Sequence, residues 1–145
     1  MPQLKFSLQI ATTFAQIPAK NLFKKWTNAT LRVDTEVTIR VVDEAEGRAL
    51  NLNYRNKNYA TNVLTFTITE TPHLMGDIVI CAPIVFKEAA EQGKTIAAHF
   101  AHLTVHGILH LHGYDHELEA QAALMEAIEI QILAKLGYAH PYLIL

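Results

Sequence analysis

The chain is organised around residues 106 to 116, which read His106-Gly107-Ile108-Leu109-His110-Leu111-His112-Gly113-Tyr114-Asp115-His116. If residues 95 to 112 form a helix, His106 and His110 lie four positions apart and project from one face, close enough to share one metal ion. Gly113 is the residue type that ends a helix in a left-handed turn, so the chain can reverse there and return His116 to the same ion. The stretch therefore predicts one zinc ion bound by His106, His110 and His116, with a fourth position open to water or substrate.

The residues between these ligands carry further predictions. His112 is two positions from His110 and faces away from it, so it is not expected to bind the ion. Gly107 stands where the H-E-x-x-H helix of zinc peptidases has its general base, and it suggests that another backbone or a substrate comes close. Asp115 either orients a ligand imidazole or caps the turn. The alternative for the whole cluster is a set of hydrogen-bonded core and surface histidines without metal.

The same eleven residues resemble the H-G-x-L-H-L-x-G-Y-D-H signature of the YbeY family, bacterial endoribonucleases and ribosomal RNA maturation factors. Three further blocks of the sequence are similar to family motifs: residues 50–57 (Leu-Asn-Leu-Asn-Tyr-Arg-Asn-Lys), 61–66 (Thr-Asn-Val-Leu-Thr-Phe) and 76–81 (Gly-Asp-Ile-Val-Ile-Cys). The resemblance covers roughly residues 40 to 142. It implies a mostly parallel four-stranded sheet with one antiparallel edge, and it places Arg55 at the cleft.

The chain departs from the family pattern at three places. Ala60 stands where the family commonly has proline, and Thr65 stands where it has serine. The connection from Thr67 to Leu74 is shorter than in many relatives. Because this connection is expected to lie near the cleft, substrate contacts made by it are not carried over to this chain.

The length predicts one domain spanning residues 1 to 145, and the three-histidine motif makes it a metal-dependent hydrolase domain. Half of the residues are hydrophobic and 18% are charged, which excludes a disordered chain. No apolar run approaches the roughly 20 residues of a membrane span, and no secretory signal is recognised, so we expect a cytoplasmic protein without a membrane partner. The single cysteine, Cys81, agrees with this location and is expected to be buried packing.

Charge is unevenly distributed along the chain. Residues 1 to 60 hold nine lysines and arginines against five aspartates and glutamates, whereas residues 61 to 145 hold three against nine. The basic half predicts a local, salt-sensitive phosphate-binding patch, with ordinary solvated charges as the alternative. Its members are Lys20, Lys24, Lys25, Arg48, Arg55 and Lys57.

Apolar periodicity predicts an α/β fold, with a small mostly parallel four-stranded sheet surrounded by about five helices. Strand-like patterns of apolar and β-branched residues predict strands at residues 4–10, 36–42 and 63–68, and a nearly continuous apolar run predicts a strand at 77–81 that is buried on both faces. Helical spacing predicts helices at 18–28, 43–55, 83–93, 95–112 and 117–136. Asp43 and Glu46 resemble a capping box for the second helix. His99 and His102, on the helix of the eleven-residue motif, are interpreted as packing or supporting groups.

A zinc ion on three histidines favours hydrolysis, and Arg55 is the candidate that would stabilise the charge developing on a phosphodiester. The alternative for Arg55 is a structural ion pair. Three functions remain open. The first, implied by the resemblance, is a zinc-dependent, single-strand-specific endoribonuclease that acts on ribosomal RNA precursors and has the ribosome or its proteins as further partners. The others are a non-catalytic ribosome-assembly or RNA-binding factor with a structural metal, and a zinc peptidase-like hydrolase.

Overall fold

Four strands form one mixed sheet in the computed structural model of the protein, which describes residues 2–142. In order across the sheet they are β1 (Leu4–Ala11), β2 (Thr35–Val42), β4 (Leu74–Cys81) and β3 (Val63–Thr69). Strands β1, β2 and β4 run parallel, whereas β3 pairs antiparallel with β4 at the edge. The predicted mostly parallel sheet with one antiparallel edge is confirmed.

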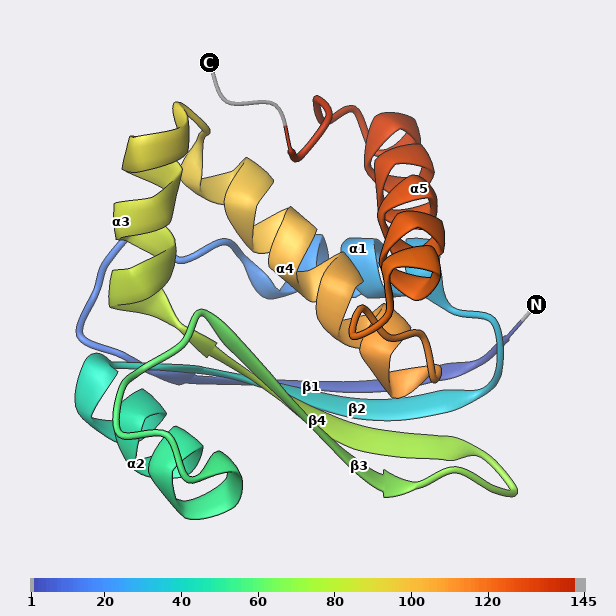
Figure 1. Ribbon diagram of the computed structural model, residues 1–145, viewed down its shortest axis with the longest axis horizontal. Coiled ribbons are helices and arrows are strands. Elements are labelled where there is room, and N and C mark those ends of the chain that lie inside the picture. The colour runs from blue at the N-terminus through green and yellow to red at the C-terminus, as the bar shows by residue number, and fades with distance from the viewer. Residues whose placement is uncertain (1, 143–145) are drawn as a thin grey trace.

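Helices cover the two faces of this sheet unequally (Figure 1). One face carries α1 (Lys20–Thr30), α3 (Ala82–Gln92), α4 (Ile96–Leu111) and α5 (Glu119–Lys135), and the other carries α2 (Glu44–Arg55). Helix α4 contacts the other three helices of its layer and also β3 and β4. It is therefore the central helix of this layer, in keeping with its many buried residues. No helix within residues 2–142 has both the length and the apolar character that crossing a membrane requires.

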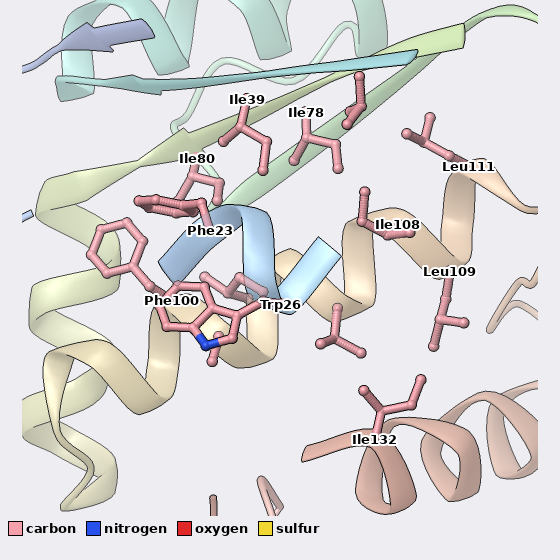
Figure 2. Packing of buried hydrophobic residues seen from close by; sticks show 14 of the residues in the cluster. Phe23, Trp26, Ile39, Ile78, Ile80, Phe100, Ile108, Leu109, Leu111 and Ile132 are labelled. Atoms are coloured by element: carbon pink, nitrogen blue, oxygen red, sulfur yellow. The ribbon is translucent and has the colours of Figure 1, made fainter. Parts of the chain in front are cut away.

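The main core fills the space between the sheet and α4. Ile78 extends from the sheet toward Ile108 of α4 (Figure 2), and both side chains are fully buried. Phe23 packs edge-to-face on Phe100 with ring centroids 5.8 Å apart. Trp26 is 1% exposed and anchors α1 in this core. Burying side chains of this size contributes about 1.5–3 kcal/mol each, so this cluster fixes α4 on the sheet.

A smaller apolar cluster lies on the other face, beneath α2. Its buried members are Val42, Leu64, Val79 and Cys81. Strand β4 is thus buried on both faces, as its continuous apolar run predicts. Cys81 is 1% exposed, so the expectation that it serves as buried packing is confirmed.

The predicted capping box at the start of α2 is wrong. Asp43 occupies the N-cap position, but its side chain makes no capping hydrogen bond. Its carboxylate instead accepts hydrogen bonds from the Thr12 hydroxyl and from the Thr13 amide, the latter at 3.2 Å, and these bonds lower the pKa of Asp43. Glu46 pairs with Arg40 of β2 at 2.6 Å. Residues in or next to the neighbouring strands therefore bind the side chains of Asp43 and Glu46, which do not form a local cap.

Some predicted boundaries also differ from the structure. Pro18 lies before α1, whose N-cap is Ala19, and α5 begins at Glu119 rather than at residue 117. Strands β3 and β4 extend into the connection between residues 67 and 74, because the antiparallel ladder continues through it. Glu70 of this connection lines a hollow beside His112. None of the described residues 67–74 lines the pocket onto which His106, His110 and His116 open.

Two glycines allow the close approach of α4 to the sheet, and they predict different effects on stability. A Cβ atom added at Gly76 would lie 2.8 Å from the carbonyl oxygen of Phe66 and 2.6 Å from Leu111 Cδ2. One added at Gly107 would meet only side chains, the nearest being Ile78 at 3.1 Å. The groups nearest to Gly107 are therefore side chains of the sheet and not another backbone.

We expect Gly76→Ala to lower the free energy of unfolding by about 1–3 kcal/mol, because the backbone carbonyl cannot move aside. Gly107→Ala is expected to cost less than about 1 kcal/mol, since alanine gains about that much helix propensity. Urea denaturation followed by Trp26 fluorescence measures both changes. A larger loss for Gly107→Ala than for Gly76→Ala would contradict this account.

Candidate metal centre

The motif helix begins and ends as its sequence predicts. The Thr95 hydroxyl caps its start by accepting a hydrogen bond from the Ala98 amide at 3.1 Å. Gly113 adopts a φ of +94° after the last turn, a conformation that side chains rarely tolerate. The Gly113 amide donates to the His110 carbonyl at 3.0 Å, and the Tyr114 amide donates to the Leu109 carbonyl at 3.1 Å. These bonds reverse the chain and bring the following residues back toward α4.

His106, His110 and His116 meet at this reversal. The ring centroids of His106 and His110 are 4.6 Å apart, and His116 lies 4.8 Å from His110 and 5.4 Å from His106. The Nε2 atoms of His106 and His110 are separated by 3.1 Å. Two nitrogens bound to one tetrahedral zinc ion are about 3.4 Å apart. One ring nitrogen from each of the three residues lies within 4.8 Å of the others, so the donor set fits a single ion.

The environment of His110 favours a neutral imidazole. Burial, together with the nearby His106 and His116, lowers the pKa of His110 to about 4. A neutral ring keeps a lone pair available for a metal ion at neutral pH. Asp115 accepts a hydrogen bond from the His116 amide at 2.7 Å, whereas its carboxylate is 3.9 Å from His116 Nδ1. Asp115 therefore caps the turn, one of the two roles that the sequence leaves open.

His112 lies outside the cluster. Its Nδ1 atom donates to the Ile108 carbonyl at 2.8 Å, and its Nε2 atom accepts from the Arg32 amide at 3.2 Å. Both ring nitrogens are thus engaged by backbone groups on the side of α4 that faces the loop after α1. This arrangement leaves no ring nitrogen of His112 for an ion at the cluster of His106, His110 and His116.

A buried carboxylate on α5 contacts the Nδ1 atom of His106, whereas Nε2 of the same ring lies beside His110. Glu129 is fully buried, and it accepts hydrogen bonds from His106 Nδ1 at 2.9 Å, His102 Nε2 at 2.8 Å and the Tyr142 hydroxyl at 2.7 Å. Burial alone would raise its pKa, but the hydrogen bonds from the two histidines lower the pKa of Glu129 to about 2. His102, His106 and Glu129 are also close enough to form a second group of potential metal ligands.

Sequence reasoning missed Glu129, although one signal was present. Met125, Glu129 and Ile132 follow one another at helical spacing along the buried stripe of α5, and a carboxylate on such a stripe requires a partner. His99 and His102, interpreted from the sequence as packing or supporting groups, each lie beside a carboxylate. His102 contacts Glu129, and His99 Nε2 lies 2.9 Å from Glu88 on α3.

A pocket of about 360 Å³ opens onto the three histidines. Arg55, at the last position of α2, lines the same pocket, and no carboxylate within residues 2–142 forms an ion pair with it. Arg55 therefore does not form, with any described residue, the structural ion pair that was considered as its alternative role. Residues 61–65, at the start of β3, form another wall. Asp115 and Glu117 also line the pocket, and sequence reasoning had not connected Glu117 with the site.

The single basic patch expected from residues 20 to 57 is wrong. Lys20, Lys24 and Lys25 belong to α1, which lies on the face of the sheet opposite to α2 (Figure 1). Arg48 lines a separate hollow on α2. Of the six basic residues considered, Arg55 is the one that lines the histidine pocket. The sheet separates charges that are neighbours in the sequence.

Comparison with known proteins gives a consistent result. The family described as "Endoribonuclease YbeY" matches residues 6–137. The protein named Endoribonuclease YbeY from Methylobacillus flagellatus is 58% identical over 142 residues, covering 98% of this chain and 95% of that protein. The one from Nitrosomonas europaea is 49% identical, with 98% of this chain and 87% of that protein covered.

The fold is also similar to a solved structure. The solution structure of TM1509 from Thermotoga maritima superimposes with a TM-score of 0.59 at 25% sequence identity, and the match covers 90% of this chain and 91% of that one. The histidine cluster, the pocket and the matched residues 6–137 thus lead to one assignment. The chain belongs to the YbeY family.

Proposed function

We infer that this protein is an endoribonuclease that hydrolyses RNA phosphodiester bonds with a metal ion, most simply zinc, held by His106, His110 and His116. The observation that carries the proposal is the convergence of three imidazoles and Arg55 on one pocket. The family agrees, since relatives covering nearly the whole chain bear the name endoribonuclease.

Each group at the pocket would have a separate role in hydrolysis. Zinc held by three histidines would supply a water of lowered pKa and polarise a phosphoryl oxygen. The guanidinium of Arg55 can donate two parallel hydrogen bonds to the non-bridging oxygens of a phosphate, which favours the charge that develops during hydrolysis. Asp115 and Glu117 face the same pocket and can accept the proton that the attacking water loses.

The substrate we propose is single-stranded RNA, in particular unpaired regions of ribosomal RNA precursors, with the ribosome as the surrounding partner and the cytoplasm as the location. A flexible strand can bring a phosphate into the pocket, whereas a duplex must first unpair at a cost of a few kcal/mol. Of the six basic residues considered, Arg55 alone lines the pocket. We therefore expect few phosphate contacts, about two. A salt dependence of about 5- to 10-fold between roughly 50 and 200 mM follows.

A cleavage assay on matched single- and double-stranded RNA across this salt range tests the proposal. Protein stripped of metal and then refilled with zinc is expected to lose and regain cleavage of the single strand in step with its metal content, while the duplex stays largely intact. A peptide library is the control. Peptide hydrolysis with intact RNA would instead indicate a peptidase-like hydrolase. RNA binding that needs no zinc and leads to no cleavage would indicate an assembly factor.

A further inference from the structure

We propose that Glu129 is a positioning residue, which holds the His106 ring with its proton on Nδ1 and leaves Nε2 free to bind the ion. The inference rests on the metal site proposed above. Glu129 lies on α5, 23 positions from His106 along the chain, and its carboxylate oxygen Oε1 is 2.9 Å from His106 Nδ1. On the far side of the ring, His106 Nε2 is 3.1 Å from His110 Nε2. One nitrogen of the His106 ring thus faces the Glu129 carboxylate, and the other faces His110, which is a second proposed ligand.

The chemistry of the carboxylate determines which nitrogen carries the proton. An ionised carboxylate can only accept hydrogen bonds, so each group within bonding distance of Glu129 must donate. His106 therefore carries its proton on Nδ1, and His102, 2.8 Å away, carries its proton on Nε2. A neutral imidazole has only one N–H, so His106 Nε2 is left with its lone pair. A carboxylate behind a ligand histidine orients the ring and increases its basicity.

The carboxylate is itself held in place by the segment that follows α5. The Tyr142 hydroxyl donates to Glu129 Oε2 at 2.7 Å, and the Tyr142 ring packs edge-to-face on His102 at 5.1 Å. Lys94 secures this segment by donating a hydrogen bond to the Pro141 carbonyl. Glu129 is therefore the buried centre of a network that connects Tyr142 to the proposed metal ligand His106.

The first measurement is the tautomer of His106 in metal-free protein, read from its two ring ¹⁵N chemical shifts at a pH where the ring is neutral. We expect the Nδ1–H form in the wild type and a mixture in Glu129→Gln, whose amide no longer imposes a donor on every neighbour. The second measurement is the Kd for zinc, which is expected to rise about 10- to 100-fold in Glu129→Gln. Tyr142→Phe keeps the ring and removes one donor, so its effect should be smaller, below about 10-fold.

Two variants serve as matched controls. Glu126→Gln removes the same charge from the exposed side of α5, and Tyr138→Phe removes a hydroxyl from the same C-terminal segment. Both are expected to retain the wild-type tautomer and Kd. If Glu129→Gln fails to fold by circular dichroism, the wild-type tautomer and Tyr142→Phe still decide the question.

Some results would overturn the inference. These are a wild-type His106 protonated mainly on Nε2, an unchanged zinc Kd in folded Glu129→Gln, or a second zinc ion per chain that is lost in Glu129→Gln, which would make His102, His106 and Glu129 a ligand set. A wild-type protein that binds no zinc yet shows the expected His106 tautomer would contradict the proposed function. It would leave the positioning contact itself intact.

Discussion

Replacing His106, His110 or His116 with alanine is expected to remove most of the bound zinc and, with it, RNA cleavage. Two imidazoles cannot replace the three-ligand set that the cluster offers. Elemental analysis of purified protein should give one zinc ion per chain for the wild type and a small fraction of that for each variant. Cleavage of single-stranded RNA, measured on the same samples, should fall in parallel.

His112→Ala is the matched control for these variants. It removes a histidine from the same motif, but one whose ring nitrogens bond to the Ile108 carbonyl and the Arg32 amide. The variant should keep its zinc, and the lost hydrogen bonds should reduce the free energy of unfolding by about 1–3 kcal/mol. Zinc loss from His112→Ala as large as from His110→Ala would mean that the ligand set is wrongly assigned.

Arg55→Ala is expected to keep the fold and the zinc but to lower RNA cleavage by about 10- to 100-fold, which corresponds to about 1.4–2.7 kcal/mol of transition-state stabilisation. Arg55 lines the pocket at the end of α2 and contacts none of the three histidines by hydrogen bond or ion pair within the described chain. Arg55→Lys should recover cleavage only in part, because an ammonium cannot reproduce the planar, two-pronged donor.

Arg48→Ala tests whether the effect is specific to the pocket. Arg48 lies two turns earlier on the same helix and lines a different hollow, so its removal changes the net charge equally. Steady-state cleavage kinetics and RNA affinity should match the wild type in Arg48→Ala. If Arg55→Ala also left both quantities unchanged, the role of Arg55 as a phosphate clamp would have to be abandoned.

The elements of this fold that depend on local sequence were predictable. Thr95 and Gly113 mark the two ends of α4, and the apolar residues between them identify a buried helix. The reversal at Gly113 brings His116 to His106 and His110, as the motif spacing predicts. Such signals act within a few residues, so no knowledge of the tertiary structure is needed to recognise them.

Contacts between distant segments could not be predicted in the same way. Asp43 and Glu46 have the spacing of a capping box, yet Thr12 and Arg40 bind them once the strands are assembled. Glu129 reaches His106 through the packing of α5 on α4, which no motif encodes. The basic residues of the first 60 positions are close together in the sequence. The sheet separates those on α1 from those on α2, because the two helices lie on opposite faces.

The two layers of the protein contribute to the pocket from opposite sides of the sheet. The histidines belong to the layer built on the large core around Phe100 and Ile108, whereas Arg55 belongs to α2, which rests on the smaller cluster around Leu64 and Cys81. Segments that bury less apolar surface open at a lower free-energy cost than the molecule as a whole. Fraying of α2 would thus withdraw the guanidinium from the pocket while the three histidines stayed together, so we expect mild denaturant to abolish cleavage before it disrupts the histidine cluster.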